Sequence, residues 1–391
     1  MNKLKIAVIF GSRSTEHDIS IITAIASVIK PLLLSDQYEV VPVYISKDGK
    51  WYSSNKFINI ELYSSGKIAS FLASLKPIYL ELNSGFKLVY PGIKNKVISI
   101  DCVFPATHGT HGEDGELMAI LQMANVAFVG CNMQASVLSM DKALTKTLAK
   151  SANIPVSNFV WFHSYEYRAN AQKILDQVKL LRYPLFVKPV HLGSSIAISR
   201  VKNSKELIKA IELAMFYDNK VIIEEAVNNL IELTLPIIGN LDQLTPAFLE
   251  RPQLKDLDFF DFETKYMNGG KKGGGAKGSQ SSANNNYSQL PAKVDKEIAK
   301  QAITIATDVY KLLGCSGISR IDLLVDELTK KVYFNEINPL PGDLYKHNWQ
   351  ANGISPKELV DRLIKLALEN FKVQSELQSS FSSNYLSQFK S

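Results

Sequence analysis

The sequence contains few cysteines, and they are not arranged as in a metal site or a disulfide framework. Cys102, Cys131 and Cys315 are the three cysteines of the 391-residue chain, and no two of them form a CxxC pair. Structural zinc sites and disulfide-rich secreted domains both need closely spaced cysteines. The composition therefore argues against both classes and favours a reducing compartment, so we expect a cytoplasmic protein.

The sequence also lacks a long apolar run. A membrane-spanning helix needs about 20 consecutive apolar residues, whereas the run near the start, KIAVIF at residues 5–10, meets polar residues after the length of one strand. This length predicts a buried strand rather than a signal peptide. We therefore expect no membrane partner.

Charge of one sign is not concentrated anywhere in the chain. It has 44 Lys and Arg against 38 Asp and Glu, a net charge of +6. Nucleic-acid binders show clustered basic residues, often with interleaved aromatics, and this sequence has no such stripe. We expect no nucleic-acid partner, and the mild positive charge suits small anionic substrates.

The alternation of apolar runs and helical patterns in the first third of the chain predicts a parallel sheet covered by helices. A chain of this length also exceeds a single core and predicts two or three compact units. The stretch over residues 51–97 is less regular and indicates an insertion. The expected strands cover residues 5–10, 39–45, 99–105 and 127–130, and the expected helices cover residues 20–34 and 114–124.

The rest of the chain predicts a second α/β region with a glycine-rich loop. Residues 267–290 have the composition of a loop that cannot bury a core, and nearby lysines favour a lid over an anion. Later strands are expected over residues 185–189, 196–200, 221–227, 232–238, 257–262, 318–325 and 331–335, with helices over residues 204–217, 294–313 and 355–372. The expected domains are an N-terminal α/β substrate domain (1–135), a central subdomain (136–227), a C-terminal subdomain (228–373) and a flexible tail (374–391).

Lys188 lies in the apolar strand LFVKP, where an unpaired ammonium is costly. The turn that follows contains Gly193, Ser194 and Ser195. Glycine permits a close backbone approach, and the serines offer hydroxyls and amides to phosphate oxygens. We therefore favour phosphate binding by Lys188, and by Lys142 at the start of a helix, over the alternative that Lys188 extends to solvent.

Asp322, Glu336 and Asn338 are candidate metal ligands. Glu336 and Asn338 are two residues apart and so share one face of an extended segment. If their strand pairs with the strand of Asp322, three oxygen ligands of the kind that Mg²⁺ prefers converge. The alternative is a structural ion pair between Glu336 and Arg320.

Arg320 is expected on the same strand face as Asp322. A guanidinium beside a metal can stabilise charge on a transferred phosphoryl group or on an oxyanion. The backbone N–H of Gly342 is a candidate for the same role.

The motif HGTHGEDG, residues 108–115, has two readings. Its two histidines and two acids suit a metal site, but its glycines indicate a tight turn with acids near the start of a helix, where they favour the helix dipole. We favour a turn that contacts substrate, with His108 as the contact.

Six motifs follow one another along the chain: GSRSTEH, HGTHGEDG, FVKPVHLGSS, FDFETKY, SRID and NEINPLPG. Together they resemble the motifs of the D-alanine–D-alanine ligases of the ATP-grasp superfamily. The resemblance extends from about residue 5 to about residue 370. It implies an ATP-grasp fold preceded by a parallel-sheet, Rossmann-like N-terminal domain. It also implies ATP-dependent joining of two D-alanines through an acyl phosphate, for peptidoglycan precursors, with ATP and Mg²⁺ (or Mn²⁺) as cofactors. The family is commonly dimeric, so a homodimer is an expected form.

The resemblance also implies roles for individual residues. Glu16 matches the residue that binds the ammonium of the first substrate, coupled to Ser194 and to Tyr266 of the lid. Arg320 and the Gly342 amide match the oxyanion stabilisers, and Asp322, Glu336 and Asn338 match the metal ligands. The positions that match the ATP site are Lys142, Lys188, Ser194, Ser195, Glu224, Glu225, Val227, Glu232 and Lys265.

The sequence departs from the family pattern at several places, among them the strand before Glu232, which lacks the usual arginine. Ser12 and Ala197 stand where the family has glycine. The segment NPLPGDLYKHNW, residues 338–349, is shorter than usual and lacks the serine that binds the carboxylate of the second substrate; Lys346 and His347 are candidate replacements. The alternatives are therefore a D-alanine acceptor, which FETKY favours, another acceptor (D-serine, D-lactate or another amino acid), and a weakened nucleotide-binding homologue.

Overall fold

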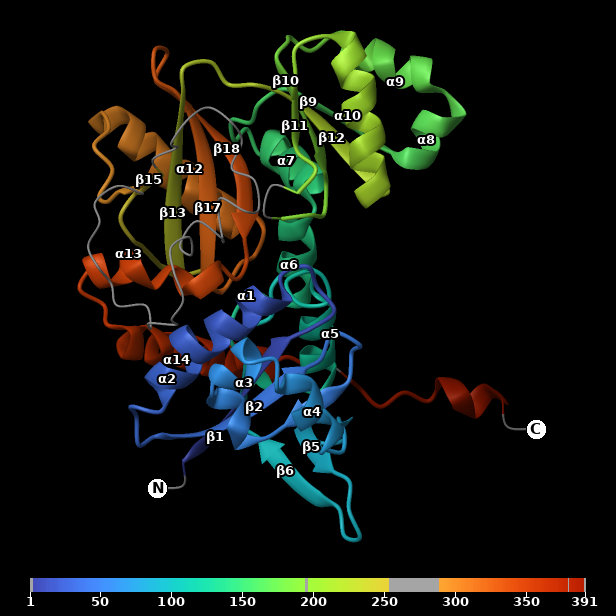
Figure 1. Ribbon diagram of the computed structural model, residues 1–391, viewed down its shortest axis with the longest axis vertical. Helices are drawn as coiled ribbons and strands as arrows, with labels where there is room; N and C mark the ends of the chain where they lie inside the picture. The colour runs from blue at the N-terminus through green and yellow to red at the C-terminus, as the bar shows by residue number, and fades with distance from the viewer. Residues whose placement is uncertain (1–2, 194–195, 253–287, 379, 390–391) are drawn as a thin grey trace.

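The computed structural model describes residues 3–193, 196–252, 288–378 and 380–389. Figure 1 shows an α/β layer at the bottom, formed by the N-terminal part of the chain, and two separate β-sheets above it. Helices α5 (Glu116–Met123), α6 (Met133–Met140) and α7 (Lys142–Ser151) run from the first layer to the space between the two sheets. These three helices therefore connect the N-terminal layer with both sheets.

The N-terminal sheet is built around β1 (Leu4–Gly11), which pairs in parallel with β2 (Tyr38–Ile45) and β7 (Cys102–Pro105). Residues 6–10 are completely buried, as expected for a strand that is covered on both faces. The parallel sheet expected from the sequence is therefore confirmed. The sheet is completed by β8 (Ala127–Phe128) and by the antiparallel edge strand β3 (Trp51–Ser53).

The first helical segment differs from its prediction. It begins at His17 rather than at residue 20, because the Ser20 N–H already donates a helical hydrogen bond to the Glu16 carbonyl oxygen at 3.0 Å. It then passes through a π-helical stretch before it ends near Leu33. The helices and turns of this part are α1 (His17–Ile22), η1 (Thr23–Ile29), α2 (Lys30–Leu32), η2 (Asn55–Ile58), α3 (Glu61–Ser64) and α4 (Ile68–Ala73).

Residues 51–97 contain regular structure as well as loops. The strands β4 (Tyr79–Glu81), β5 (Phe86–Tyr90) and β6 (Lys96–Ile100) form a small antiparallel sheet. The single strand expected over residues 99–105 is wrong, because β6 and β7 belong to different sheets. The break falls at Asp101, whose carboxylate accepts a hydrogen bond from the Lys5 N–H at 2.8 Å.

The central sheet is antiparallel, with the order β11-β10-β12-β9. The expected strand over residues 196–200 is shifted, since β11 begins at Ser199, and the strand expected to reach Val227 ends at Glu225. Its elements are β9 (Phe159–His163), α8 (Ser164–Ala169), α9 (Ala171–Val178), β10 (Leu185–Pro189), β11 (Ser199–Val201), α10 (Ser204–Tyr217) and β12 (Lys220–Glu225).

The C-terminal sheet has the order β14-β13-β17-β18, and its residues alternate between two faces. Leu233, Leu235 and Leu323 are buried on the face that packs with α12. The other face carries the polar residues Thr234, Arg320 and Asp322, and at one end the apolar Ile238 and Ile318, which are buried in the core cluster of the N-terminal layer. This alternation is typical of a sheet with one face in a core. The elements are β13 (Leu230–Asn240), β14 (Gln243–Pro246), α12 (Lys296–Leu312), β17 (Gly317–Asp326) and β18 (Lys331–Asn338), and β15 (Arg251–Pro252) pairs with β16 (Ser288–Gln289).

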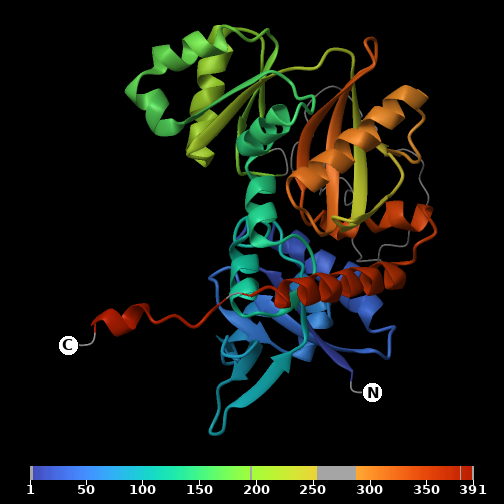
Figure 2. The same ribbon diagram turned by 180° about the vertical axis from the view of Figure 1, so that it is seen from behind.

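The last helix, α14 (Pro356–Ser375), packs on the N-terminal part of the chain. Leu359 and Leu363 share a core cluster with Ile6 and Val8 of β1, and Figure 2 shows the helix lying across the N-terminal layer. The chain reaches α14 through η3 (Gly342–Tyr345) and α13 (Lys346–Ala351). The packing of α14 fixes the C-terminal sheet relative to the N-terminal layer.

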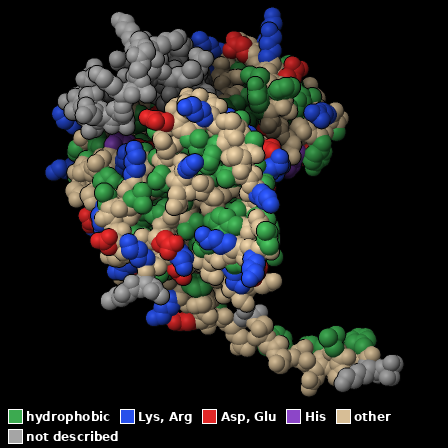
Figure 3. Space-filling model, turned by 60° about the horizontal axis from the view of Figure 1, so that its bottom comes forward, with side chains coloured by type: hydrophobic (Ala, Val, Ile, Leu, Met, Phe, Trp, Pro, Cys, Tyr) green, Lys and Arg blue, Asp and Glu red, His purple; other side chains and the backbone are tan. Residues whose placement is uncertain are grey.

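Beyond α14 the chain extends away from the body and ends with the short turn η4 (Tyr385–Phe389). Figure 3 shows hydrophobic side chains on this extension, and Phe381, Leu386 and Phe389 are all exposed. Within the described ranges, none of the helices combines the length and the apolar character needed to span a bilayer.

Candidate active site

Helix α7 presents two lysines to the space between the two sheets. Lys142 and Lys146 are four residues apart and therefore lie on one face of the helix. The Nζ of Lys142 lies 3.6 Å from a carboxylate oxygen of Glu336 on β18. The Nζ of Lys146 lies 2.8 Å from Glu224 on β12. One helix thus links the central and C-terminal sheets through two ammonium groups.

Lys188 has the anionic partner that its buried position demands. Its Nζ donates a hydrogen bond to Glu224 at 2.8 Å, so Glu224 accepts contacts from two lysines at once. Burial works against ionisation of this carboxyl, but the charges of Lys146 and Lys188 outweigh it and lower the pKa of Glu224 to about 2. The three side chains form a buried group with a net positive charge, which suits a site for an anion.

Asp322 and Glu336 lie directly opposite each other in the antiparallel pair β17–β18, and Arg320 lies opposite Asn338. The pairing of the two strands, on which the predicted metal site depends, is therefore present. Residues opposite one another in a sheet point to the same face, and like charges there repel unless a cation lies close. Two carboxylates and an amide oxygen are a donor set that Mg²⁺ prefers.

A bulge follows this pair and sets the direction of Glu336. The register shifts between Asp322 and Leu323, so that Leu323 pairs with Phe334 and leaves Asn335 as the extra residue. Bulges are common beside active sites because they redirect a side chain. Lys146 donates to the side-chain oxygen of Asn335 at 3.5 Å, which ties the bulge to α7.

Asn338 supports the same location for a ligand. Its side-chain nitrogen is buried and has no hydrogen-bond partner among the described residues. Buried polar groups are usually satisfied, so an unsatisfied amide marks a position where a bound group can supply the contact. Because this nitrogen is a donor, a bound acceptor such as a phosphate oxygen would satisfy it. The fit to a divalent cation rests instead on the oxygens of Asp322, Glu336 and Asn338.

Arg320 is held by two neighbours, Asp322 and Tyr345. It donates two hydrogen bonds to Asp322, at 2.8 and 2.7 Å, and its guanidinium lies 5.5 Å from the centre of the Tyr345 ring. Burial alone would lower the pKa of Arg320, but the charge of Asp322 outweighs it and raises that pKa. The Tyr345 hydroxyl pairs with Thr234 at 3.1 Å, so the ring below the guanidinium is fixed to β13.

Glu16 lies where the N-terminal layer meets the turn after β10. A Cβ placed on Gly109 would lie 3.1 Å from one oxygen of Glu16, and a Cβ on Gly193 would lie 3.5 Å from the other. The carboxylate is therefore between the HGTHGEDG motif and the loop that leads to Ser194. The expected triad partners Ser194 and Tyr266 lie outside the described residues.

The HGTHGEDG motif forms a tight turn before α5. His108 is buried, with Nε2 2.9 Å from the Thr23 hydroxyl and Nδ1 3.3 Å from Glu113. Burial lowers the pKa of His108, but the hydrogen bond and charge of Glu113 outweigh this and raise it. His111, Asp114 and Glu116 place their potential ligand atoms within 4.8 Å of one another, although His111 and Glu116 are partly exposed and Asp114 accepts hydrogen bonds from the turn backbone.

The segment after Asn338 makes a left-handed turn. Asp343, Leu344 and Tyr345 have φ angles of 56°, 52° and 53°. Asp343 lies on the N-terminal layer, where its side chain accepts from Ser27 and its N–H donates to the Thr23 hydroxyl at 3.0 Å. Gly342, next to it, approaches Ile19 of α1.

The two candidate acceptor-site cations already have partners. Lys346 lies 2.7 Å from Asp343 and 3.1 Å from the hydroxyl of Ser27. His347 lies 2.8 Å from Glu250. Lys346 thus forms an ion pair with Asp343, a contact that the sequence did not indicate.

Three of the remaining ATP-site candidates, Glu225, Val227 and Glu232, lie among the described residues on β12, on β13 or in the connection between them. Glu225 ends β12 and pairs with the exposed Arg182 at 3.0 Å. Val227 lies in the connection to β13, and Glu232 is half-buried on β13. Ser194, Ser195, Lys265 and Tyr266, the expected strand over residues 257–262 and residues 267–287 of the lid loop lie outside the described residues.

The two substitutions of family glycines occupy left-handed backbone. Ser12 has a φ angle of 87° and Ala197 one of 56°, a region in which glycine is free of steric cost.

Sequence reasoning missed Lys146 and His191. The spacing of Lys146 from Lys142 was a usable signal for the first, whereas the partners of His191 are distant in sequence.

Comparisons with known proteins agree with this geometry. Residues 5–131 match the family described as D-ala D-ala ligase N-terminus, and residues 148–365 match D-ala D-ala ligase C-terminus. The chain is 34% identical over 374 residues to D-alanine–D-alanine ligase B of Clostridium tetani, covering 95% of each chain. It is 35% identical to the D-alanine–D-alanine ligase of Chloroherpeton thalassium, covering 95% of this chain and 98% of that one.

Solved structures show the same relationship. The D-alanine–D-alanine ligase of Coxiella burnetii superposes with a TM-score of 0.77 at 29% identity, covering 96% of this chain and 97% of that one. The VanG D-Ala:D-Ser ligase of Enterococcus faecalis gives a TM-score of 0.75 at 32% identity, covering 94% and 100%. The expected fold class, an ATP-grasp fold preceded by a parallel-sheet domain, is confirmed. The chain belongs to the D-alanine–D-alanine ligase family.

Proposed function

We propose that this chain joins two molecules of D-alanine at the cost of one ATP, and so makes D-alanyl-D-alanine for peptidoglycan precursors. The observation that carries this proposal is the pairing of Asp322 with Glu336 beside Arg320, facing the lysines of α7 and β10. Family membership over nearly the whole chain supports the same reaction.

In this reaction one carboxylate oxygen of the first D-alanine attacks the γ-phosphorus of ATP, and ADP leaves. The amine of the second D-alanine then attacks the carbonyl carbon, and phosphate leaves with the original carboxylate oxygen. The first step brings two anions together, so positive charge must surround them. Lys142 and Lys188 supply this charge from two sides of the site.

Asp322, Glu336 and Asn338 would hold Mg²⁺ (or Mn²⁺). When bound, the ion would neutralise phosphate oxygens and orient the nucleotide. Arg320 would stabilise the charge that develops on the carbonyl oxygen, together with the N–H of Gly342. Since Asp322 and Tyr345 fix the guanidinium, little reorganisation is needed at the moment of reaction.

Glu16 would bind the ammonium of the first D-alanine. Its carboxylate lies between Gly109 and Gly193, and neither glycine has a side chain that would fill the space beside it. His108, fixed by Glu113 and Thr23, would contact the same substrate. Lys346 and His347 would contact the carboxylate of the acceptor. Exclusion of water protects the acyl phosphate from hydrolysis.

A coupled assay of ADP release tests the proposal. D-Alanine with ATP and Mg²⁺ is expected to give one ADP per dipeptide, and faster turnover than the pairs D-alanine with D-serine or D-alanine with D-lactate. ADP release that needs another acceptor would identify a different ligase. ATP binding without ADP release under any amino acid would identify a weakened nucleotide-binding homologue.

A further inference from the structure

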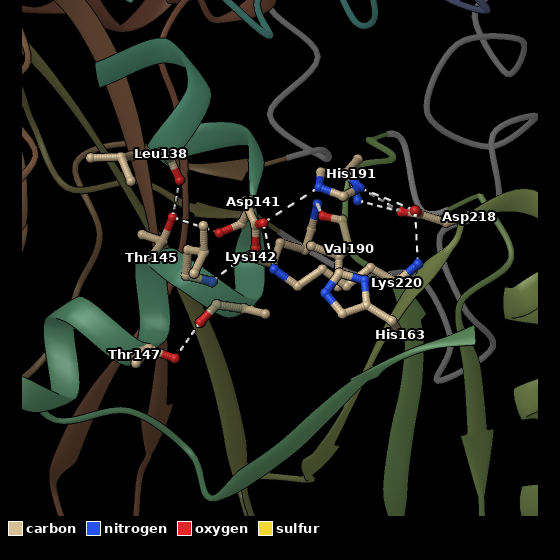
Figure 4. A network of polar contacts seen from close by, with 12 residues as sticks. Leu138, Asp141, Lys142, Thr145, Thr147, His163, Val190, His191, Asp218 and Lys220 are labelled. Carbon is tan, nitrogen blue, oxygen red and sulfur yellow. Dashed lines mark hydrogen bonds and ion pairs between the residues drawn. The ribbon is translucent and has the colours of Figure 1, made fainter. Parts of the chain in front are cut away.

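A network of charged side chains lies next to Lys142 and consists of Asp141, His191, Asp218 and Lys220 (Figure 4). Asp141 ends α6 and caps α7, where one of its carboxylate oxygens accepts from the Leu144 N–H at 2.8 Å. The other oxygen accepts from the Nζ of Lys220 on β12 at 2.6 Å. Asp141 and Lys220 are both buried. The residue before Lys142 is therefore fixed to the central sheet.

His191 joins this network from the turn that follows β10. Its backbone N–H donates to Asp218, at the end of α10, at 2.7 Å, and its Nδ1 lies 3.0 Å from the same carboxylate. Its Nε2 lies 3.4 Å from Asp141. Carboxylate oxygens only accept hydrogen bonds, so both ring nitrogens must carry a proton to satisfy these contacts. The ring between the two carboxylates is therefore an imidazolium.

The balance of charge points the same way. Asp141 and Asp218 carry two negative charges, and Lys220 and a protonated His191 carry two positive ones. A neutral ring would leave one partly buried carboxylate without compensation, which is costly. Hydrogen bonds to Asp141 and Asp218 outweigh burial and raise the pKa of His191 to about 9. Two other charged groups are near: Lys142, and Asp114, which lines the same cavity of about 280 Å³ as His191.

The backbone on both sides of His191 holds Lys142. The Nζ of Lys142 donates to the carbonyl oxygen of Leu192 at 2.8 Å and to that of Val190 at 3.5 Å. Any movement of residues 190–192 therefore moves the ammonium. The contacts of the His191 ring and N–H restrain these residues against α7 and α10.

We propose that His191 is a positioning residue for ATP binding, whose ring holds residues 190–192 against Asp141 and Asp218 and so directs the ammonium of Lys142 toward the phosphates. This role rests on the proposed function, because it assumes that Lys142 binds ATP. His191 itself need not touch the nucleotide.

Calorimetric titration with ATP and Mg²⁺ in the absence of D-alanine, at pH 7.5, tests this role. His191→Ala is expected to weaken ATP binding about tenfold and to raise the KM for ATP by a similar factor. The KM for D-alanine and kcat are expected to stay within about twofold. His191→Gln, which keeps one donor, is expected to weaken ATP binding about threefold and provides the measurement if the alanine variant does not fold.

Asn203→Ala is the matched control. Asn203 caps the opposite end of α10 by accepting from the Glu206 N–H, so the variant lowers the Tm by loss of a cap without touching the network. Its ATP affinity is expected to equal that of the wild type. This control separates a general loss of stability from a loss of positioning.

The pH dependence gives a second readout that a purely structural role would not move. The ATP affinity of the wild type is expected to fall as pH rises through about 9, and the ratio between the affinities of wild type and His191→Ala is expected to approach one. A His191→Ala variant that binds ATP as tightly as the wild type at pH 7.5 would overturn this role alone. Wild-type protein that binds no ATP would overturn the proposed function and this role with it.

Discussion

Asp322 and Glu336 face each other across the β17–β18 pair, two carboxylates on neighbouring strands at the edge of a bulge. Opposed carboxylates destabilise a sheet by up to about 1 kcal/mol, so their presence indicates a use that offsets this cost. Arg320 contacts the first and Lys142 lies near the second. A divalent cation between them would be the strongest compensation.

Glu336→Gln is therefore expected to lower kcat/KM by about 100-fold or more, since it removes a charged metal ligand. Turnover measured against Mg²⁺ concentration is also expected to show a higher requirement for the ion. Glu327→Gln, at an exposed carboxylate beyond the end of β17, is the control and is expected to leave turnover unchanged. Wild-type kinetics in the Glu336 variant would show that this residue is not a metal ligand.

Glu224 is predicted to be important for stability as well as for the site. Glu224→Gln leaves two buried ammonium groups without their anion, and breaking such a group costs about 3–5 kcal/mol. The free energy of unfolding from urea titration measures this loss. Arg362→Gln, which removes an exposed pair with Glu358 on α14, is expected to cost less than about 1 kcal/mol. Equal losses of the free energy of unfolding in the two variants would contradict the view that Glu224 neutralises two buried lysines.

Stability is predicted to depend on pH through His191. Its pKa rises from 6.5 to about 9 on folding, so the folded state binds the proton more tightly. The stabilisation is complete below pH 6.5 and is lost as pH rises through 9. Because the side chain is 42% exposed, solvent screening limits the effect to about 1 kcal/mol. Urea denaturation of wild type and His191→Ala at pH 6.0, 7.5 and 9.5 measures the difference, and a difference that does not shrink with pH would oppose this assignment.

Lys346 is predicted to affect the acceptor rather than the nucleotide. Lys346→Met is expected to raise the KM of the second D-alanine about tenfold, the effect of losing one charged hydrogen bond, with the KM for ATP unchanged. Lys365→Met removes an exposed pair with Glu369 and serves as the control. If the acceptor KM is unaffected, the carboxylate of the acceptor is bound elsewhere.

The arrangement of the candidate metal ligands could be predicted from the sequence because it is local. Glu336 and Asn338 share a strand face by their spacing, and one assumption, the pairing with the strand of Asp322, completes the set. Lys188 was expected to need an anion because an unpaired ammonium in an apolar strand is costly. Its partner within the chain, Glu224, is 36 residues away, and such a pair cannot be read from one strand.

The failures have physical causes as well. The apolar residues of β6 and β7 are nearly contiguous, so the sequence does not reveal that the chain changes sheets at Asp101. The contacts of His191 with Asp141 and Asp218 depend on how α7 and α10 pack on the central sheet. The pairing of Lys346 with Asp343 depends on a left-handed turn of three residues that are not glycine.

Oxygen transfer tests the central claim, that this chain activates a D-alanine carboxylate by phosphorylation. The protein is incubated with ATP, Mg²⁺ and D-alanine labelled with ¹⁸O in both carboxylate oxygens, and the inorganic phosphate is analysed by mass spectrometry. The account predicts one ¹⁸O atom in each phosphate released and one at the new peptide carbonyl. Dipeptide formed together with phosphate that carries no ¹⁸O would contradict it.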